Sequence, residues 1–201
     1  MRHILALILL LTFSQLIAQS LPWTDGRIML NDGTEAKGKL LYNDITGVVS
    51  FESETNSGSY NARNILGFEY LNKQFYSIPY ASSTGVVKQF FEVLREYKEF
   101  AVISKTNLLS QGTTSEITTL YFMRASDLIV KPFLETLARE VKWRIFESNK
   151  TQIRVLDSNL PKEIMGENFE KVKAFAKERK LVWHVQDSLI SILDYYDTLI
   201  N

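Results

Sequence analysis

The chain has 201 residues, of which 45% are hydrophobic and 23% are charged, proportions typical of a folded globular protein. Lys and Arg together number 23, as do Asp and Glu, so the formal net charge is zero. This balance argues against a general nucleic-acid binder, which needs a basic face. The sequence contains no cysteine, which excludes disulfides, thiolate nucleophiles and cysteine-ligated metal sites.

Residues 1–19 have the order of a secretory signal peptide. Arg2 and His3 precede an uninterrupted apolar run at 4–11, and small or polar residues follow it. We therefore expect cleavage after Ala18 or Gln19 and a secreted or periplasmic mature protein. The apolar run is shorter than the about 20 residues that span a membrane, and no later run reaches that length, so we expect no transmembrane span in the mature protein. A lipoprotein anchor is not expected, because its lipid is carried on a cysteine.

Short β-strands separated by turn residues dominate the first part of the mature chain. The turns contain Gly33 and Gly47, and Gly38 lies inside a strand, where it indicates a bulge or a close approach. The predicted strands cover residues 27–30, 35–42, 48–52, 65–71 and 74–78, with a further turn at 56–58. This spacing is typical of a sandwich, a roll or a small barrel, and the pattern is loosely similar to SH3-like or Sm-like barrels.

Residues 87–105 are ambiguous between a helix and a hairpin. The segment at 90–99 contains good helix formers, yet Phe91 and Val93 alternate with Phe90 and Leu94 as they would in a strand. We favour two strands, at 87–95 and 99–105, joined by a turn at 97–98.

The second half of the chain is predicted to contain further hairpins and then helices. Residues 106–115 are polar and are expected to form a loop or a boundary between modules. Strands are predicted at 117–123, 128–130, 142–147 and 152–156, with a short helical turn at 133–138 and a hairpin turn at 148–150.

The hydrophobic period changes to that of helices near the C-terminus. A short helix at 159–165 is expected to be capped by Ser158 and followed by Gly166. A lysine-rich amphipathic helix is predicted at 168–180. A last helix begins near Asp187, and its apolar face comprises Leu189, Ile192, Leu193 and Tyr196.

These elements predict an α+β protein with an antiparallel β-rich body, in which a small roll-like or barrel-like N-terminal meander is followed by further hairpins. Two or three short C-terminal helices close this body. After the signal peptide, we expect a β-rich module at 20–105 and a part with hairpins and helices at 106–201, forming one continuous mature domain.

No catalytic set is recognisable in the sequence. His184 is the single histidine outside the expected signal peptide. A catalytic triad would join it to Asp187 and a serine, but the chain has no G-x-S-x-G turn or other nucleophile motif. One histidine cannot provide a usual zinc ligand set, so no metal or cofactor is expected. The segment at 31–35 resembles part of a calcium loop, but it lacks the full ligand spacing.

Carboxylate pairs are the remaining route to acid–base chemistry. The candidates lie close together in two stretches of the sequence, as Glu92, Glu96 and Glu99 and as Asp194 and Asp197. Acidic residues interspersed with Lys and Arg are more typical of a solvated face.

Aromatic residues are concentrated in the middle of the chain, where they indicate either a binding platform or ordinary strand cores. The row comprises Phe68, Tyr70, Phe75, Tyr76, Tyr80, Phe90 and Phe91.

The order of motifs resembles a group of uncharacterised secreted proteins from Gram-negative, Bacteroidetes-type bacteria. The resemblance comprises AQS at 18–20, WxDGxIxLxDGxxxxGxLxY at 23–42, GFEY at 67–70, FFEVL at 90–94 and DYY at 194–196. It implies export but no activity, cofactor or catalytic residue.

The leading hypothesis is a non-enzymatic exported module that binds an envelope protein or a glycan through its β-rich body. One alternative is a glycosidase-like hydrolase with a carboxylate pair. Another is a structural component of an envelope or export assembly.

Overall fold

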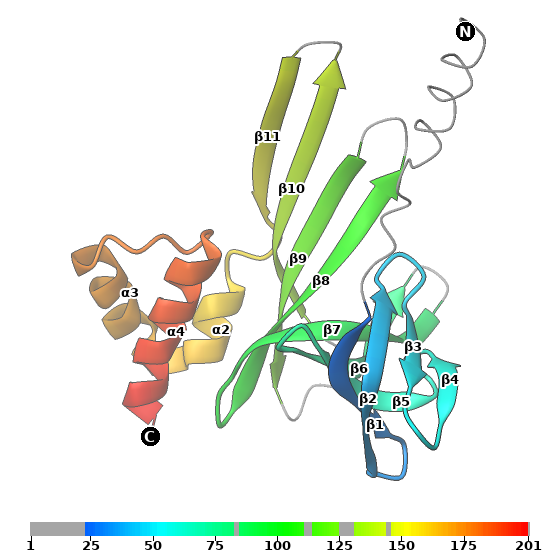
Figure 1. Ribbon diagram of the computed structural model, residues 1–201. Helices are drawn as coiled ribbons and strands as arrows, with labels where there is room; N and C mark the ends of the chain where they lie inside the picture. The colour runs from blue at the N-terminus through cyan, green and yellow to red at the C-terminus, as the bar shows by residue number, and fades with distance from the viewer. Residues whose placement is uncertain (1–22, 83–84, 111–113, 125–130, 144–145, 201) are drawn as a thin grey trace, which may run out of the picture.

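The computed structural model describes residues 23–82, 85–110, 114–124, 131–143 and 146–200 (Figure 1). Within these residues, an antiparallel sheet is followed by helices. The strands are β1 (Thr24–Leu30), β2 (Glu35–Asn43), β3 (Val48–Glu52), β4 (Ser57–Tyr60), β5 (Ile65–Tyr70), β6 (Lys73–Ser82), β7 (Gly85–Glu96), β8 (Phe100–Ser110), β9 (Thr114–Arg124), β10 (Lys131–Trp143) and β11 (Phe146–Val155). The helices are α2 (Leu160–Met165), the 3-10 helix η1 (Gly166–Asn168), α3 (Phe169–Glu178) and α4 (Gln186–Ile200). The predicted α+β class is confirmed.

The described strands form one sheet in the order β11-β10-β9-β8-β7-β6-β5-β1-β2-β3-β4, and every neighbouring pair is antiparallel. Consecutive strands are neighbours in the sheet except at one point. There, β5 does not pair with β4. It pairs with the edge of β1 that lies opposite β2. This return groups β1 to β5 into a small unit, which we call the N-terminal roll.

The N-terminal roll encloses a core of its own. Ile28, Leu40, Val49 and Ile65 come from four different strands, and all are fully buried in one cluster. Because β3 and β5 are separated by two other strands in the sheet, their side chains can meet only if the sheet curls. Phe90 of β7 also belongs to this cluster and joins the roll to the rest of the sheet.

The hairpin at 87–105 is confirmed, and the alternative helix is wrong. β7 and β8 are joined by a tight turn, in which the N–H of Tyr97 donates to the carbonyl of Phe100 at 2.8 Å. Phe90 and Phe91 are both buried, although strand alternation places them on opposite faces. The two rings belong to separate hydrophobic clusters, as expected for a strand that is buried on both faces.

The long hairpins differ from the sequence prediction. The expected loop at 106–115 is shorter, because the β8–β9 ladder continues to the pair Ser110↔Thr114. The helical turn predicted at 133–138 is wrong, because these residues lie in β10 and pair with both β9 and β11. Two ladders of backbone hydrogen bonds outweigh a weak local helix preference.

The turn predicted at 148–150 is also wrong. These residues lie within β11, and the hairpin closes at the pair Trp143↔Phe146. The register of a hairpin depends on the position of its closing turn, so this displacement changes every predicted pair. The strand predicted at 128–130 lies outside the described residues.

Two smaller predictions are corrected by local hydrogen bonds. The turn expected at 56–58 falls earlier, because the N–H of Ser53 donates to the carbonyl of Asn56 and Gly58 already belongs to β4. The cap of α2 is not Ser158. Instead, Asp157 Oδ1 accepts hydrogen bonds from the N–H groups of Asn159 and Leu160, at 2.9 and 3.1 Å.

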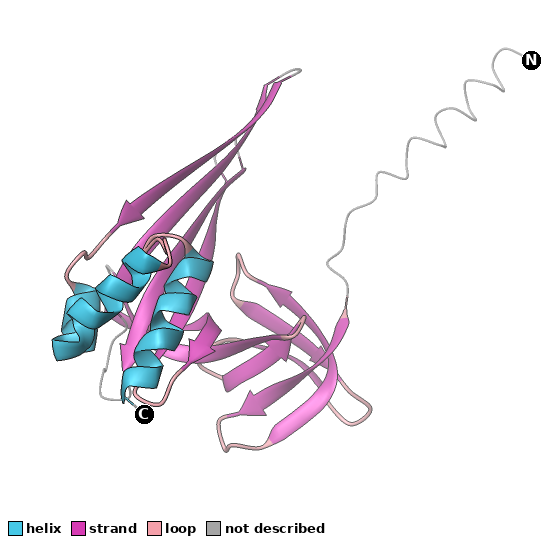
Figure 2. Cartoon of the chain, turned by 90° about the vertical axis from the view of Figure 1, so that its left-hand side faces the viewer, coloured by secondary structure: helices cyan, strands magenta, loops and turns pink. Residues whose placement is uncertain are grey.

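The helices cover one face of the long strands (Figure 2). The predicted apolar face of α4 is confirmed, because Leu189, Ile192, Leu193 and Tyr196 are all buried. They pack in one cluster with strand residues that include Phe122. Burial of each large aliphatic side chain contributes about 1.5–3 kcal/mol, so this layer is a substantial part of the fold.

The opposite face of the central strands has a third cluster, which contains Ile78, Phe91, Ile103 and Tyr121. The ring of Tyr80 in β6 lies 6.1 Å from that of Tyr121 in β9, although two strands separate them in the sheet. The sheet therefore curves around this cluster. The junction expected between residues 105 and 106 falls inside β8, so the strand runs through it without a break.

Candidate functional site

The sheet divides where β7 and β8 separate. Residues 92–96 of β7 pair with residues 101–104 of β8. Within this short ladder, a register shift between Val93 and Arg95 marks a bulge in β7. Among the described residues, 86–91 then pair only with β6, and 105–107 pair only with β9. Bulges bend strands and increase their twist, which explains the separation. We call residues 86–91 and 105–107 the sheet fork; Figure 1 shows β7 running away from β8 and β9.

Two hollows of about 350 Å³ each adjoin the sheet fork. Both are lined by Tyr42, Asp44, Phe90 and Lys105, so they meet over these four residues. The N-terminal roll provides Tyr42 and Asp44, whereas the two arms of the sheet fork provide Phe90 and Lys105. The site therefore exists only where these parts of the fold come together.

Lys105 is the partly buried cation of this site. Its Nζ atom lies 5.8 Å from the ring centroid of Phe91, which is a cation–π contact. Burial lowers the pKa of Lys105, and the negative charge of Asp44 acts in the opposite direction. Within the described part of the chain, no carboxylate lies within 4 Å of its ammonium group. Folding removes water from around the Lys105 ammonium group, and an anion bound beside it would compensate for this lost hydration.

Tyr42 forms the aromatic floor of the hollows. Its ring centroid lies 4.8 Å from that of Phe68 and 5.2 Å from that of Phe75. Burial, with a smaller contribution from the charge of Asp44, raises the pKa of Tyr42 to about 12. The hydroxyl therefore stays protonated at neutral pH and can act as a hydrogen-bond donor.

Other polar groups converge on the same place. Arg63, Lys88 and Gln89 line one of the hollows. The Oε1 atom of Gln89 is buried and has no hydrogen-bond partner in the described structure. At the rims, Ile45 is 71% exposed and Leu71 is 55% exposed. Apolar rims with a few convergent polar groups are typical of binding sites.

The predicted aromatic row does not form a single platform. Phe68, Tyr70, Phe75 and Phe90 pack in the core of the N-terminal roll. The remaining members, Tyr76, Tyr80 and Phe91, belong to the cluster on the other face of the sheet. The strand-core interpretation therefore accounts for the row.

The structure brings together three of the five candidate carboxylates. Glu96, Asp194 and Asp197 line an open groove of about 610 Å³. Glu92 lies outside this groove, where it lines one of the hollows at the sheet fork and forms an ion pair with Lys73 at 3.0 Å. Glu99 is exposed at the β7–β8 turn and does not line this groove.

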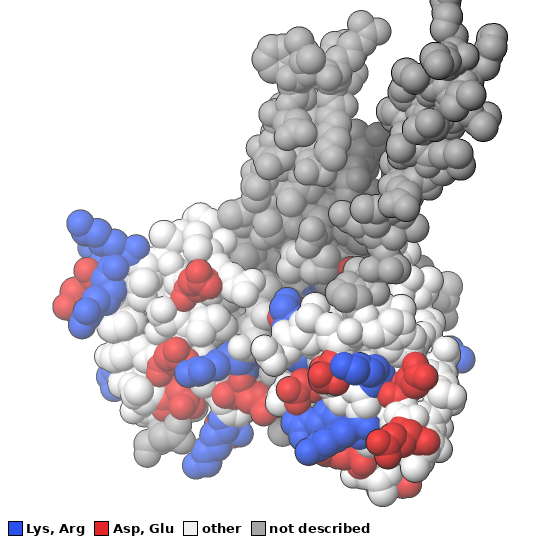
Figure 3. All heavy atoms as spheres, in the orientation of Figure 1, with Lys and Arg blue, Asp and Glu red and all other residues white. Residues whose placement is uncertain are grey.

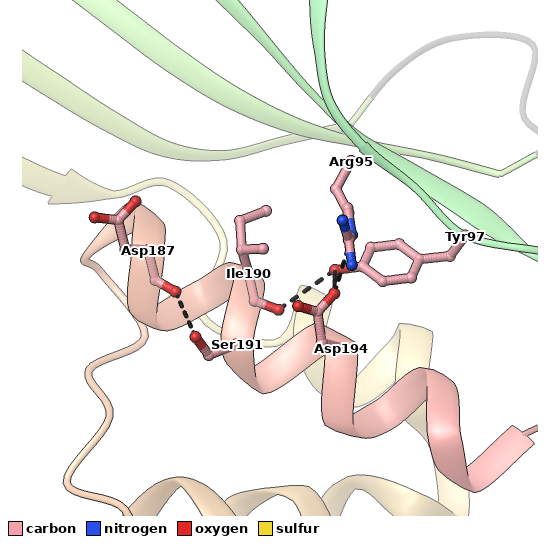
Figure 4. A network of polar contacts seen from close by, with 6 residues as sticks. All are labelled: Arg95, Tyr97, Asp187, Ile190, Ser191 and Asp194. Atoms are coloured by element: carbon pink, nitrogen blue, oxygen red, sulfur yellow. Dashed lines mark hydrogen bonds and ion pairs between the residues drawn. The ribbon is translucent and has the colours of Figure 1, made fainter.

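Asp194 holds α4 against the β7–β8 turn (Figure 4). Its Oδ1 atom accepts hydrogen bonds from Arg95 Nε at 3.1 Å and from the Tyr97 hydroxyl at 3.0 Å. Burial, followed by this hydrogen bond to Asp194, raises the pKa of Tyr97 well above its usual range. These contacts give Asp194 a structural role in joining helix and sheet.

The remaining candidates from the sequence lie in turns. His184 is exposed between α3 and α4, and Asp187 is exposed in the first turn of α4. In the segment 31–35, Asp32 Oδ1 accepts hydrogen bonds from the N–H and hydroxyl of Thr34, which uses the carboxylate in the turn. The residues that the structure describes contain no cluster of three or more His, Cys, Asp or Glu side chains that could hold a metal ion.

Charges of both signs alternate over the visible surface of the N-terminal roll, whereas Lys and Arg gather over α3 (Figure 3). None of the helices in the described part of the chain is long and apolar enough to cross a membrane. Comparison with protein-family models, curated proteins and solved structures finds no match to this chain.

Sequence reasoning missed the sheet fork. The one local signal is Lys105, a cation that directly follows the buried strand residues 101–104. Asp44, Phe90 and Lys105 are far apart in the sequence, so only the folded chain brings them together.

Proposed function

We propose that this protein is exported and acts as a non-enzymatic binding module of the cell envelope, with the sheet fork as its ligand site. The observation that carries this proposal is the partly buried Lys105, which lies between two hollows without a carboxylate partner in the described structure. A desolvated cation beside an aromatic floor is suited to hold an anionic group.

The first residues of the chain support the proposed export. Arg2, His3 and the apolar run at 4–11 form a sequence that a secretion machinery would recognise, and cleavage would follow Ala18 or Gln19. The resemblance of the motifs at 23–42 and 67–70 to secreted proteins of Gram-negative, Bacteroidetes-type bacteria supports the same location. The ligand would then be an envelope protein or a glycan.

Binding by wild-type protein and by matched variants tests the proposal. The purified protein is incubated with a glycan array and with solubilised Gram-negative envelope proteins. Lys105→Gln removes the central cation of the site, whereas Lys37→Gln makes the same chemical change on the exposed face of β2. We expect a reproducible ligand that the Lys105 variant retains at least tenfold less well and that the Lys37 variant retains fully.

Two results would contradict the proposal. One is the absence of any reproducible ligand on the array and among the envelope proteins. The other is a ligand that binds the Lys105→Gln variant as tightly as the wild type, provided that the circular dichroism spectra show both to be folded.

A further inference from the structure

Building on the proposed function, we infer that the sheet fork binds an extended acidic segment of a partner polypeptide, which adds as a strand to the unpaired edge of β7. Three features of the structure support this assignment: the backbone edge, the charge of the site and the apolar rims.

The edge of β7 is the feature that selects an extended polypeptide. Over residues 86–91, the described ladder pairs β7 with β6 on one side only. Six residues of strand present roughly 20 Å of edge. Each residue has backbone donors and acceptors, and an added strand satisfies those on the open side. Of the two outer strands of the described sheet, β4 has four residues and offers a shorter edge, whereas β11 has ten residues but lines neither hollow.

The charge of the site selects an acidic segment. Arg63, Lys88 and Lys105 line one hollow at the sheet fork, where Asp44 is the one carboxylate among the described lining residues. The other hollow adds Lys73 and Glu92, which pair with each other, so cations remain in excess over the two hollows together. None of the first three cations has a carboxylate within 4 Å in the described structure. A Glu or Asp side chain of the added strand would pair with Lys105, and others would meet the two cations at the rim.

The apolar rims match the alternating side chains of a strand. Exposed Ile45 and Leu71 can cover apolar side chains of the partner. In contrast, the rings of Tyr42, Phe75 and Phe90 pack against one another, so they do not form the open stacking surface that a sugar prefers.

The test uses an array of eight-residue peptides in which Thr and Val alternate with zero to four Glu residues. The tightest peptide is then measured in solution by fluorescence anisotropy. A second version of this peptide carries N-methyl groups on the backbone nitrogens of one edge. These groups leave the Glu charges unchanged but remove the N–H donors that would pair with β7. Polygalacturonate serves as an acidic probe without a peptide backbone. The proteins are the full chain and its Lys105→Gln, Lys88→Gln and Lys37→Gln variants.

We expect affinity to rise with the number of Glu residues and to fall as salt increases. N-methylation should abolish binding, and Lys105→Gln should weaken it about tenfold, as for loss of one charge-assisted hydrogen bond. Amide hydrogen exchange at 86–91 should slow when the peptide binds. Lys88→Gln should weaken binding less than Lys105→Gln. Because the Lys88 side chain is exposed, its substitution should not prevent folding, so this variant tests the role of charge even if Lys105→Gln fails to fold. Lys37→Gln should leave binding unchanged.

Other outcomes separate the two proposals. Binding that tolerates N-methylation, or protection at β4 instead of β7, would overturn strand addition at the sheet fork. If polygalacturonate binds through Lys105 and no peptide does, the ligand site stands but its polypeptide partner is wrong. If neither probe binds and the fork variants retain every envelope ligand, both proposals fail.

Discussion

At Gly38, strand β2 passes so close to β3 that no side chain fits. A Cβ atom placed there would overlap the carbonyl oxygen of Glu52 and the ring of Phe51. The register between β1 and β2 runs through Gly38 without a shift, so the close approach anticipated from the sequence is present and the alternative bulge is not. The missing side chain thus permits the close approach of β2 and β3, and Gly26 and Gly67 allow similar approaches elsewhere in the N-terminal roll.

Substitution of Gly38 by Ala should therefore destabilise the protein. Because the overlap is with backbone, which cannot move aside cheaply, we expect a loss of about 1–3 kcal/mol in the free energy of unfolding. The measurement is urea denaturation followed by circular dichroism. Gly58→Ala in β4 is the matched control, because its new Cβ would meet only the movable side chain of Tyr60 at 3.3 Å. Equal losses in both variants would refute the explanation.

At the scale of elements, hydrophobic period identified most strands and helices. The faces of α3 and α4 were predictable because buried positions recur every three to four residues. The strand β10 was not predictable, because the helix and strand propensities of its residues are weak and its pairing partners lie on β9 and β11. Likewise, the attachment of α4 to the sheet depends on Asp194, Arg95 and Tyr97, which come together only after folding.

A double-mutant cycle should detect that attachment. Tyr97→Phe and Asp194→Ala remove the two ends of one hydrogen bond, so their combined effect should be smaller than the sum of the single effects. We expect a coupling free energy of about 0.5–1.5 kcal/mol in thermal or urea denaturation.

Tyr195→Phe combined with Asp194→Ala provides the control for this cycle. Tyr195 is the next residue of the same helix, and its ring stacks on Phe175 at 4.0 Å instead of reaching Asp194. Its coupling should be near zero. A coupling for Tyr97 that is no larger than the control would mean that Asp194 does not anchor α4 through this hydroxyl.

At the scale of the whole molecule, one strand links all three hydrophobic clusters. β7 contributes Phe90 to the core of the roll, Phe91 to the cluster on the curved face and Leu94 to the helical layer. Loss of any one cluster exposes part of the same strand. The continuity of β8 through residues 105 and 106 has a similar effect, because it joins the parts expected at 20–105 and 106–201.

The described parts should consequently unfold together. Variants that retain only Trp23 or only Trp183 place a fluorescent probe at the start of the roll or in the helical layer. We expect their urea denaturation curves to coincide with each other and with the circular dichroism curve of the same variant. Separate midpoints for the two probes would show that the roll and the helical layer fold as independent units.

The sequence by itself determined the class of the fold, most of its strands, the β7–β8 hairpin and the apolar faces of the helices. These features depend on residues that are close in the chain, where the alternation of side chains and the position of glycine leave a local pattern. Tertiary structure decided the pairing of β5 with β1, the register of the last hairpin and the curling of the sheet. It also decided the sheet fork. The long-range pairing of β5 with β1 forms the roll that carries Asp44, and the bulge in β7 separates the strands that carry Phe90 and Lys105.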